Sequence, residues 1–415
     1  MIETLMSQAE SDCIQQHRNI DSITETNQKR VLDAFIKNRI SDSHFNSTSG
    51  YGYDDLGREG LEAVYADVFG GEDALVRPQI VSGTHAITTV LFGLLRPDDE
   101  LIYITGKPYD TLEEVIGKRG TNNTGSLRDF KIKYNEVSLR EEGYVDYSGI
   151  KDAINEGTKV IGIQRSKGYD DRPSFTVDEI GEMVRFIKEI KEDIIIFVDN
   201  CYGEFVEVKE PLHVGADIIA GSLIKNPGGG IVRAGGYIVG RQDLVNQCAN
   251  RLTAPGLGKE TGATLNMLQE MYQGFFLAPH VVGEALKGAV LTARFLDLAG
   301  FRTSPGYREA RTDLIQSVTF PDADQMVAFC QAIQQNSPVN SYVTPYPSEM
   351  PGYEDKVIMA AGTFIQGSSI ELSADGPIRA PYTAFVQGGL TYAHIKIALR
   401  ESVKILSEKG FLSNE

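Results

Sequence analysis

The sequence predicts an α/β fold in which a mostly parallel sheet is flanked by helices and followed by a smaller C-terminal α+β domain. Between residues 60 and 240, short β-branched runs alternate with stretches of helical periodicity. The β-branched runs are almost continuously apolar, which is typical of parallel strands covered on both faces. After residue 240 the alternation gives way to one long helical pattern. We therefore expect a helix and loop arm over residues 1–60, a large domain over 61–285 and a small domain over 286–415.

The elements of the arm and of the large domain follow from local patterns. Apolar residues recur at helical spacing over residues 26–40, which predicts an amphipathic helix ahead of the Gly-rich loop SGYGYDDLGRE. Further helices are expected at residues 61–69, 85–95, 111–116 and 177–190. Strands are expected at residues 75–81, 101–105, 160–164, 194–198, 218–220 and 237–239.

The C-terminal part shows fewer strand signals. A long helix over residues 265–298 is predicted to bridge the two domains. Beyond it we expect strands at residues 317–320 and 369–372 and a final helix at 392–407. The chain shows no internal repeat.

Composition and charge limit the possible partners. Of the 415 residues, 41% are hydrophobic and 23% charged, as in ordinary soluble proteins. The net charge of −17 argues against nucleic acid or an anionic membrane, because both attract clustered Lys and Arg. The four cysteines contain no C-x-x-C pair, so neither a disulfide framework nor a zinc ribbon is indicated. Since the N-terminus has no signal-like segment and no run of about 18 apolar residues occurs, we expect a cytoplasmic protein.

An acid and an amine follow two of the expected strands. Asp199 ends the run IIIFVD, and Lys225 follows the run ADIIAGSLI. In open parallel sheets, ligands bind beyond the carboxyl ends of the strands, so the two side chains are expected to converge there. An isolated pair of this kind would more simply be solvated surface charges. Lys225, however, lies between an apolar strand and three glycines, which is unusual for a solvated lysine.

This pair suits pyridoxal 5'-phosphate. A lysine that is desolvated in such a crevice loses part of its preference for the charged form, and the neutral amine can form a Schiff base with an aldehyde. A carboxylate against the pyridine nitrogen favours the protonated ring, which then acts as an electron sink. Lys225 is therefore the candidate for the Schiff base, and Asp199 is the candidate partner of the ring nitrogen.

A third strand end offers donors for the phosphate. In the run VSGTHA, a Gly turn precedes a helix start, so the amides of Gly83 and Thr84 would point at an anion. Ser222 would add a hydroxyl. On its own this pattern is more often a plain helix cap.

Tyr109, after the strand LIYIT, is expected to stack on the cofactor ring, although core or rim packing explains such a tyrosine equally well.

These residues, in this order, resemble the fold-type I pyridoxal phosphate enzymes, and among them the branch of the cystathionine lyases and methionine gamma-lyase. The match runs from about residue 50 to residue 240 and includes VDNCYGEF, PLHVGADIIAGSLIK and SGTHAITTVLFGLL. The run GYGYDDLGREGLEAVYADVFG and the segment SLIKNPGGGIVRAGGY are most similar to the bacterial aluminium resistance protein family. The resemblance implies a fold-type I architecture, with a homodimer or homotetramer whose subunits share their active sites.

The same resemblance assigns roles to individual residues. It implies that Lys225 carries the cofactor, that Asp199 meets its ring nitrogen and that Tyr109 stacks on the ring. Gly83, Thr84 and Ser222 would then hold the phosphate.

The chain also departs from these relatives. They usually have a second hydroxyl one residue before the lysine, where this chain has Ile224. The missing donor would come from Tyr51, Tyr53 or Arg58 in a loop that reaches the neighbouring subunit. Where methionine gamma-lyases have a reactive cysteine shortly after the tyrosine, this chain has Asp110 and Thr111.

The carboxylate of an amino-acid substrate calls for an arginine fork. Arg379, in ADGPIRAPY, is the candidate, with a solvated loop arginine as an equally good interpretation. GLGKET lacks the Ser or Thr that a Walker A motif has after its lysine, and no H-E-x-x-H metal helix is present, so no metal site is expected.

The leading hypothesis is therefore a lyase that eliminates the β- or γ-substituent of a sulfur-containing or similar amino acid. An aminotransferase on the same fold is the nearest alternative reaction. A regulatory protein that binds pyridoxal phosphate without turnover is the alternative from another class.

Overall fold

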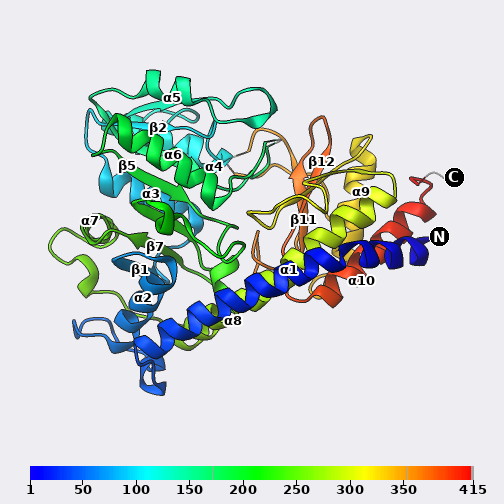
Figure 1. Cartoon of the computed structure of the whole chain (residues 1–415), viewed down its shortest axis with the longest axis horizontal. Helices are drawn as coiled ribbons and strands as arrows, with labels where there is room; N and C mark the ends of the chain where they lie inside the picture. Colours follow the sequence, from blue (N-terminus) through cyan, green and yellow to red (C-terminus); the bar gives the residue numbers. More distant parts are fainter. Residues whose placement is uncertain (171, 352, 413–415) are drawn as a thin grey trace.

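The computed structural model describes residues 1–170, 172–351 and 353–412 of the chain. It contains two sheets in two regions, and two long helices run along both regions (Figure 1). The sequence-based expectation of a larger α/β region followed by a smaller one is confirmed in this arrangement.

The large sheet has seven strands and is mostly parallel, as the sequence predicts. In spatial order the strands are β1 (Asp73–Arg77), β7 (Gly236–Gly240), β6 (Ile218–Ser222), β5 (Ile195–Asp199), β4 (Thr158–Gln164), β2 (Glu100–Tyr103) and β3 (Lys133–Glu136). From β6 to β3 every neighbouring pair is parallel, whereas β7 runs antiparallel to both β6 and β1. The carboxyl ends of β4, β5 and β6 therefore lie at one edge of the sheet.

Helices cover both faces of this sheet, which explains the continuous apolar strands. The helices of this region are α2 (Leu56–Phe69), α3 (Gly83–Leu94), α4 (Asp110–Ile116), α5 (Tyr147–Ala153), α6 (Val177–Ile190) and α7 (Gln242–Leu252). Because side chains alternate along a strand, Ile161 of β4 joins the apolar core shared with α2 and α6, while Val160 joins the core beneath α3 and α7.

The small region has a five-stranded sheet in which all neighbours are antiparallel. Its strands in spatial order are β10 (Val357–Ala360), β11 (Ser373–Pro377), β12 (Thr383–Gln387), β9 (Gln316–Thr319) and β8 (Arg302–Ser304). The helix α9 (Ala323–Gln335) packs against it, and α10 (Tyr392–Glu408) packs on α9. The strand expected at residues 369–372 is wrong, since the segment there is irregular and β11 begins only at Ser373.

Two long helices, α1 (Ile2–Lys37) and α8 (Leu268–Leu298), lie side by side and extend across both regions (Figure 1). Helix α1 begins 24 residues earlier than the expected residue 26, because its N-terminal part is largely polar and buries only a few residues at helical spacing. Helix α8 is the one helix among the described residues that is long and apolar enough to span a membrane. Of its most apolar 18 residues, 72% are buried inside the fold, as expected of a core helix.

Candidate active site

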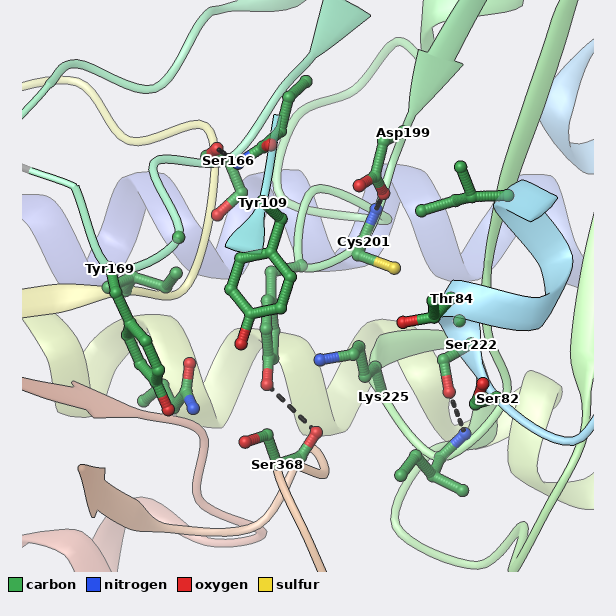
Figure 2. A pocket seen from close by; sticks show the side chains of 18 of the residues that line it. Ser82, Thr84, Tyr109, Ser166, Tyr169, Asp199, Cys201, Ser222, Lys225 and Ser368 are labelled. Atoms are coloured by element: carbon green, nitrogen blue, oxygen red, sulfur yellow. Dashed lines mark hydrogen bonds between the residues drawn. The ribbon is translucent and has the colours of Figure 1, made fainter. Parts of the chain in front are cut away.

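The carboxyl ends of three parallel strands surround a cavity of about 250 Å³ (Figure 2). Strand register places Gln164 of β4 opposite Asp199 of β5, which lies in turn opposite Ala220 of β6. The cavity is lined by Val81, Ser82, Gly83, Thr84, Ile87, Tyr109, Gln164, Ser166, Gly168, Tyr169, Asp199, Cys201, Tyr202, Ser222, Ile224, Lys225, Ile315, Ser368 and Gln387. The structure therefore brings together six residues that the sequence singles out, namely Gly83, Thr84, Tyr109, Asp199, Ser222 and Lys225.

Lys225 stands between the end of β6 and a tight turn. The carbonyl of Lys225 accepts a hydrogen bond from the Gly228 amide at 3.1 Å. The glycines that follow allow this turn to pack on α8, because a Cβ on Gly229 would lie 2.3 Å from the carbonyl oxygen of Gly274. The amine of Lys225 lies 3.7 Å from the centre of the Tyr202 ring, a favourable contact between a cation and an aromatic face.

The charges of Lys225 and Asp199 depend on their surroundings. Burial lowers the pKa of Lys225, but Tyr202, Cys201 and Asp199 oppose this effect and the net direction is upward. The sequence-based expectation is that desolvation favours the neutral amine, but the effect of the neighbours on the pKa of the lysine is larger than that of desolvation.

Burial raises the pKa of Asp199, although the Cys201 amide and Lys225 act in the opposite direction. The ionised form of Asp199 is thus poorly solvated, and a cationic partner would stabilise it strongly.

The N-terminus of α3 provides a cradle for an anion. Ser82 caps the helix by accepting a hydrogen bond from the His85 amide at 3.1 Å, so the amides of Gly83 and Thr84 remain without an intrahelical acceptor. Gly83 faces Ser222, whose Cβ would lie 3.3 Å from an added Cβ. Ser222 accepts a hydrogen bond from the Ile224 amide at 3.3 Å, which leaves its own hydroxyl hydrogen to donate. Helix capping and anion binding are therefore compatible in this segment.

Tyr109 is the N-cap residue of α4 and lines the cavity. In Figure 2 its hydroxyl and the Lys225 amine point toward the same part of the cavity. Burial and the neighbouring Tyr353 hydroxyl raise the pKa of Tyr109 well above its ordinary value. Tyr109 therefore stays protonated near neutral pH and can donate a proton rather than accept one.

Several lining residues were missed by the sequence interpretation. Cys201 and Tyr202 lie two and three residues after Asp199, so the strand-end rule could have found them. Tyr202 also has a φ of 68°, an uncommon backbone conformation for a large side chain, and its hydroxyl donates to the Ser368 carbonyl at 3.0 Å. Ser368 and Gln387 come from the small region, and no local pattern places them beside the sheet.

Arg58, Tyr51 and Tyr53 do not line the cavity of their own subunit. Arg58 disagrees with its expected role as a phosphate donor, because its side chain is 2% exposed and donates to four backbone carbonyls in two loops. It fixes the shape of the loop instead. Tyr51 and Tyr53 are 76% and 56% exposed, so their rings are free to meet another molecule.

Arg379 also lies outside the cavity lining, in the hairpin between β11 and β12. It donates to Asp355 at 3.0 Å and borders a small recess behind Tyr109 and Tyr169. Among the described residues that line the cavity, Lys225 is the sole Lys or Arg side chain. The structure therefore does not place Arg379 where the expected carboxylate contact requires it.

No three His, Cys, Asp or Glu side chains gather into a metal-binding group in the described parts of the chain.

A comparison with known proteins identifies the family. The model of the methionine gamma-lyase family matches residues 2–407. The chain belongs to this family. The expectation from sequence of a carbon–sulfur lyase is confirmed at this level.

Proteins similar to this chain come from several bacteria. The chain is 62% identical to the Bacillus subtilis protein YnbB over 99% of its own length and 98% of that protein. A structure from Listeria monocytogenes, named as a candidate cystathionine beta-lyase involved in aluminium resistance, is 60% identical, has a TM-score of 0.95 and covers 97% of this chain and 99% of its own. A structure from Clostridium novyi, named as a carbon-sulfur lyase involved in aluminium resistance, is 50% identical and has a TM-score of 0.93. The match covers 97% of this chain and 96% of the Clostridium novyi chain.

The fold extends to more distant proteins. An O-acetylhomoserine (thiol)-lyase candidate from Campylobacter jejuni is 15% identical, with a TM-score of 0.60, and covers 86% of this chain and 87% of its own. This similarity supports the fold-type I architecture expected from the sequence.

Proposed function

We propose that this protein is a pyridoxal phosphate-dependent lyase that eliminates the β- or γ-substituent of a sulfur-containing amino acid. The observation that carries the proposal is the convergence of Lys225, Asp199 and the α3 N-terminus on one cavity. In support, the distant Campylobacter jejuni protein is described with a pyridoxyl-lysine phosphate.

The residues of the cavity fit this cofactor. The amides of Gly83 and Thr84 and the hydroxyl of Ser222 would hold its phosphate, Asp199 its ring nitrogen and Lys225 its aldehyde carbon. When bound, pyridoxal phosphate supplies an electron sink for negative charge that develops at the substrate Cα.

The remaining chemistry falls to side chains of the chain itself. The Lys225 amine would act as the base that takes the proton from the substrate Cα. Loss of a β-substituent needs only the resulting carbanion. Loss of a γ-substituent needs a further proton shift and an acid near the leaving group, for which the protonated Tyr109 hydroxyl is suited. Cα chemistry would therefore depend on Lys225, and γ-elimination additionally on Tyr109.

We expect the purified protein, loaded with pyridoxal phosphate, to release ammonia and a 2-keto acid from at least one of cystathionine, cysteine, homocysteine and methionine. Methionine should be the poorest of the four, because Asp110 and Thr111 stand where methionine-specific relatives have their cysteine. A keto-acid assay on the four substrates checks this. Transamination without keto-acid release on all four would replace the lyase with an aminotransferase, and binding without any turnover would favour a regulatory role.

We further propose a cytoplasmic homodimer or homotetramer in which the Gly-rich loop of residues 50–58 reaches the neighbouring subunit. Arg58 holds this loop in place while Tyr51 and Tyr53 remain exposed, as a contact to a second copy requires. Analytical ultracentrifugation is expected to show at least a dimer, and Tyr51→Ala should weaken binding of pyridoxal phosphate without unfolding the chain. A fully active monomer would contradict this proposal.

A further inference from the structure

The small region places one side chain directly on Tyr109. Tyr353 lies in the segment between α9 and β10, and its hydroxyl contacts the Tyr109 hydroxyl. The two rings meet edge to face with their centres 6.2 Å apart. Both rings also contact Tyr169, at 6.0 Å from Tyr109 and 5.7 Å from Tyr353. A wall of three tyrosines thus joins the two regions beside the cavity.

Neighbours of Tyr353 fasten the same segment on two sides. Glu354 lies 3.6 Å from Arg119, which follows α4, and Asp355 lies 3.0 Å from Arg379 of the small region. Glu354 is 76% exposed, so its ion pair adds little to stability by itself. Arg119 follows the C-terminal end of α4, but its guanidinium donates to the Asp110 carbonyl at 3.2 Å, so the pair with Glu354 lies close to the end of α4 that Tyr109 caps.

The contact determines where the Tyr109 hydroxyl can point. A phenol that rests only on ring packing can tilt, and its hydroxyl hydrogen can rotate among acceptors. Hydrogen bonding to a second hydroxyl of fixed position removes this freedom. Either hydroxyl can be the donor of this bond. With Tyr353 as the donor, the Tyr109 oxygen is held in place and its own hydrogen stays available to the cavity, provided that the small region is docked.

We propose that Tyr353 is a positioning residue, which orients the Tyr109 hydroxyl for proton transfer to the leaving group and makes this step depend on contact between the two regions. This inference rests on the proposed lyase function. It assigns the effect to one hydroxyl, since the ring of Tyr353 also packs against Tyr169 whether or not the hydroxyl is present.

A double-mutant cycle separates the hydroxyl from the packing. The cycle consists of the cofactor-loaded parent chain, Tyr353→Phe, Tyr109→Phe and the double variant, with kcat and KM measured on a γ-substrate and on a β-substrate. We expect Tyr353→Phe to lower kcat for γ-elimination about tenfold with KM nearly unchanged. In the Tyr109→Phe background the same change should have no further effect, because its target is gone. Tyr346→Phe, in the same segment and 68% exposed, is the matched control and should match the parent.

Dissociation constants for pyridoxal phosphate, measured by fluorescence titration of the four cofactor-free proteins, provide a second readout that does not depend on turnover. Tyr353→Phe should weaken binding only when Tyr109 is present. Additive effects in both cycles, a loss in KM alone, or an equal loss in Tyr346→Phe would overturn the proposal. If the parent chain eliminates nothing, the lyase function fails by itself, and the binding cycle still decides whether Tyr353 acts through Tyr109.

Discussion

Replacing Lys225 with alanine is expected to abolish both the yellow colour of the loaded protein and its turnover. The parent chain should absorb visible light through the covalent link between Lys225 and the cofactor, and borohydride should fix this link irreversibly. Without the amine neither the link nor the Cα base remains, so we expect keto-acid release to fall by at least about a thousandfold. The visible spectrum before and after borohydride, together with a single-turnover assay, measures both losses.

Lys209→Ala is the matched control, because Lys209 is a solvent-exposed lysine that pairs with Asp178 on the surface. It should keep the colour and the rate of the parent. A Lys225→Ala protein that still releases keto acid at the parental rate would remove the central assignment. If both variants lost colour to the same extent, the effect would lie in the overall charge and not in the site.

Asp199→Asn is expected to lower activity by about a hundredfold or more while leaving the fold intact. The neutral amide no longer favours a protonated ring nitrogen, so the cofactor becomes a weaker electron sink. Keto-acid release and the melting temperature of the cofactor-free protein are the two measurements.

The effect of this change on stability has a definite sign. Burial raises the pKa of Asp199, so the folded state binds a proton more tightly than the unfolded state does. A carboxyl of this kind destabilises the folded state at any pH above the pKa that it has in the unfolded chain. The destabilisation disappears as the pH falls below that pKa. At neutral pH, Asp199→Asn should therefore leave the melting temperature equal or slightly higher. An active variant, or an inactive one with a strongly lowered melting temperature, would refute the assignment to the ring nitrogen.

The sequence predicted the parts of the site that local patterns control. Asp199 ends a strand, and Lys225 and the run of Gly83 and Thr84 come a few residues after one. Parallel strands necessarily deliver their carboxyl ends to one edge. The helix at residues 177–190 was predicted with the bounds observed for α6, because its apolar face repeats regularly and Thr176 caps it.

Other features depend on contacts between distant segments. Arg379 was chosen for its charge, but Asp355 pairs with it, and the identity of that partner follows from the folding of the small region. Arg58 was expected at a phosphate, yet it binds the carbonyls of Glu260 and Gly262, some 200 residues away in the chain. The first part of α1 escaped detection because it buries few side chains, and these meet α8 and the small region rather than its own neighbours.

The pairing of α1 with α8 constrains how the cavity can open. Met6 and Ala9 of α1 and Leu291 of α8 belong to the apolar core of the small region, while Cys13 and Val290 belong to that of the large region. The helices α1 and α8 thus pass from the large region to the small region without interruption, where a hinged protein would have a flexible linker. Rotation of the whole small region would have to tear these apolar contacts apart. A substrate must therefore reach the cavity without a rotation of the whole small region, past a wall whose shape these two helices hold constant.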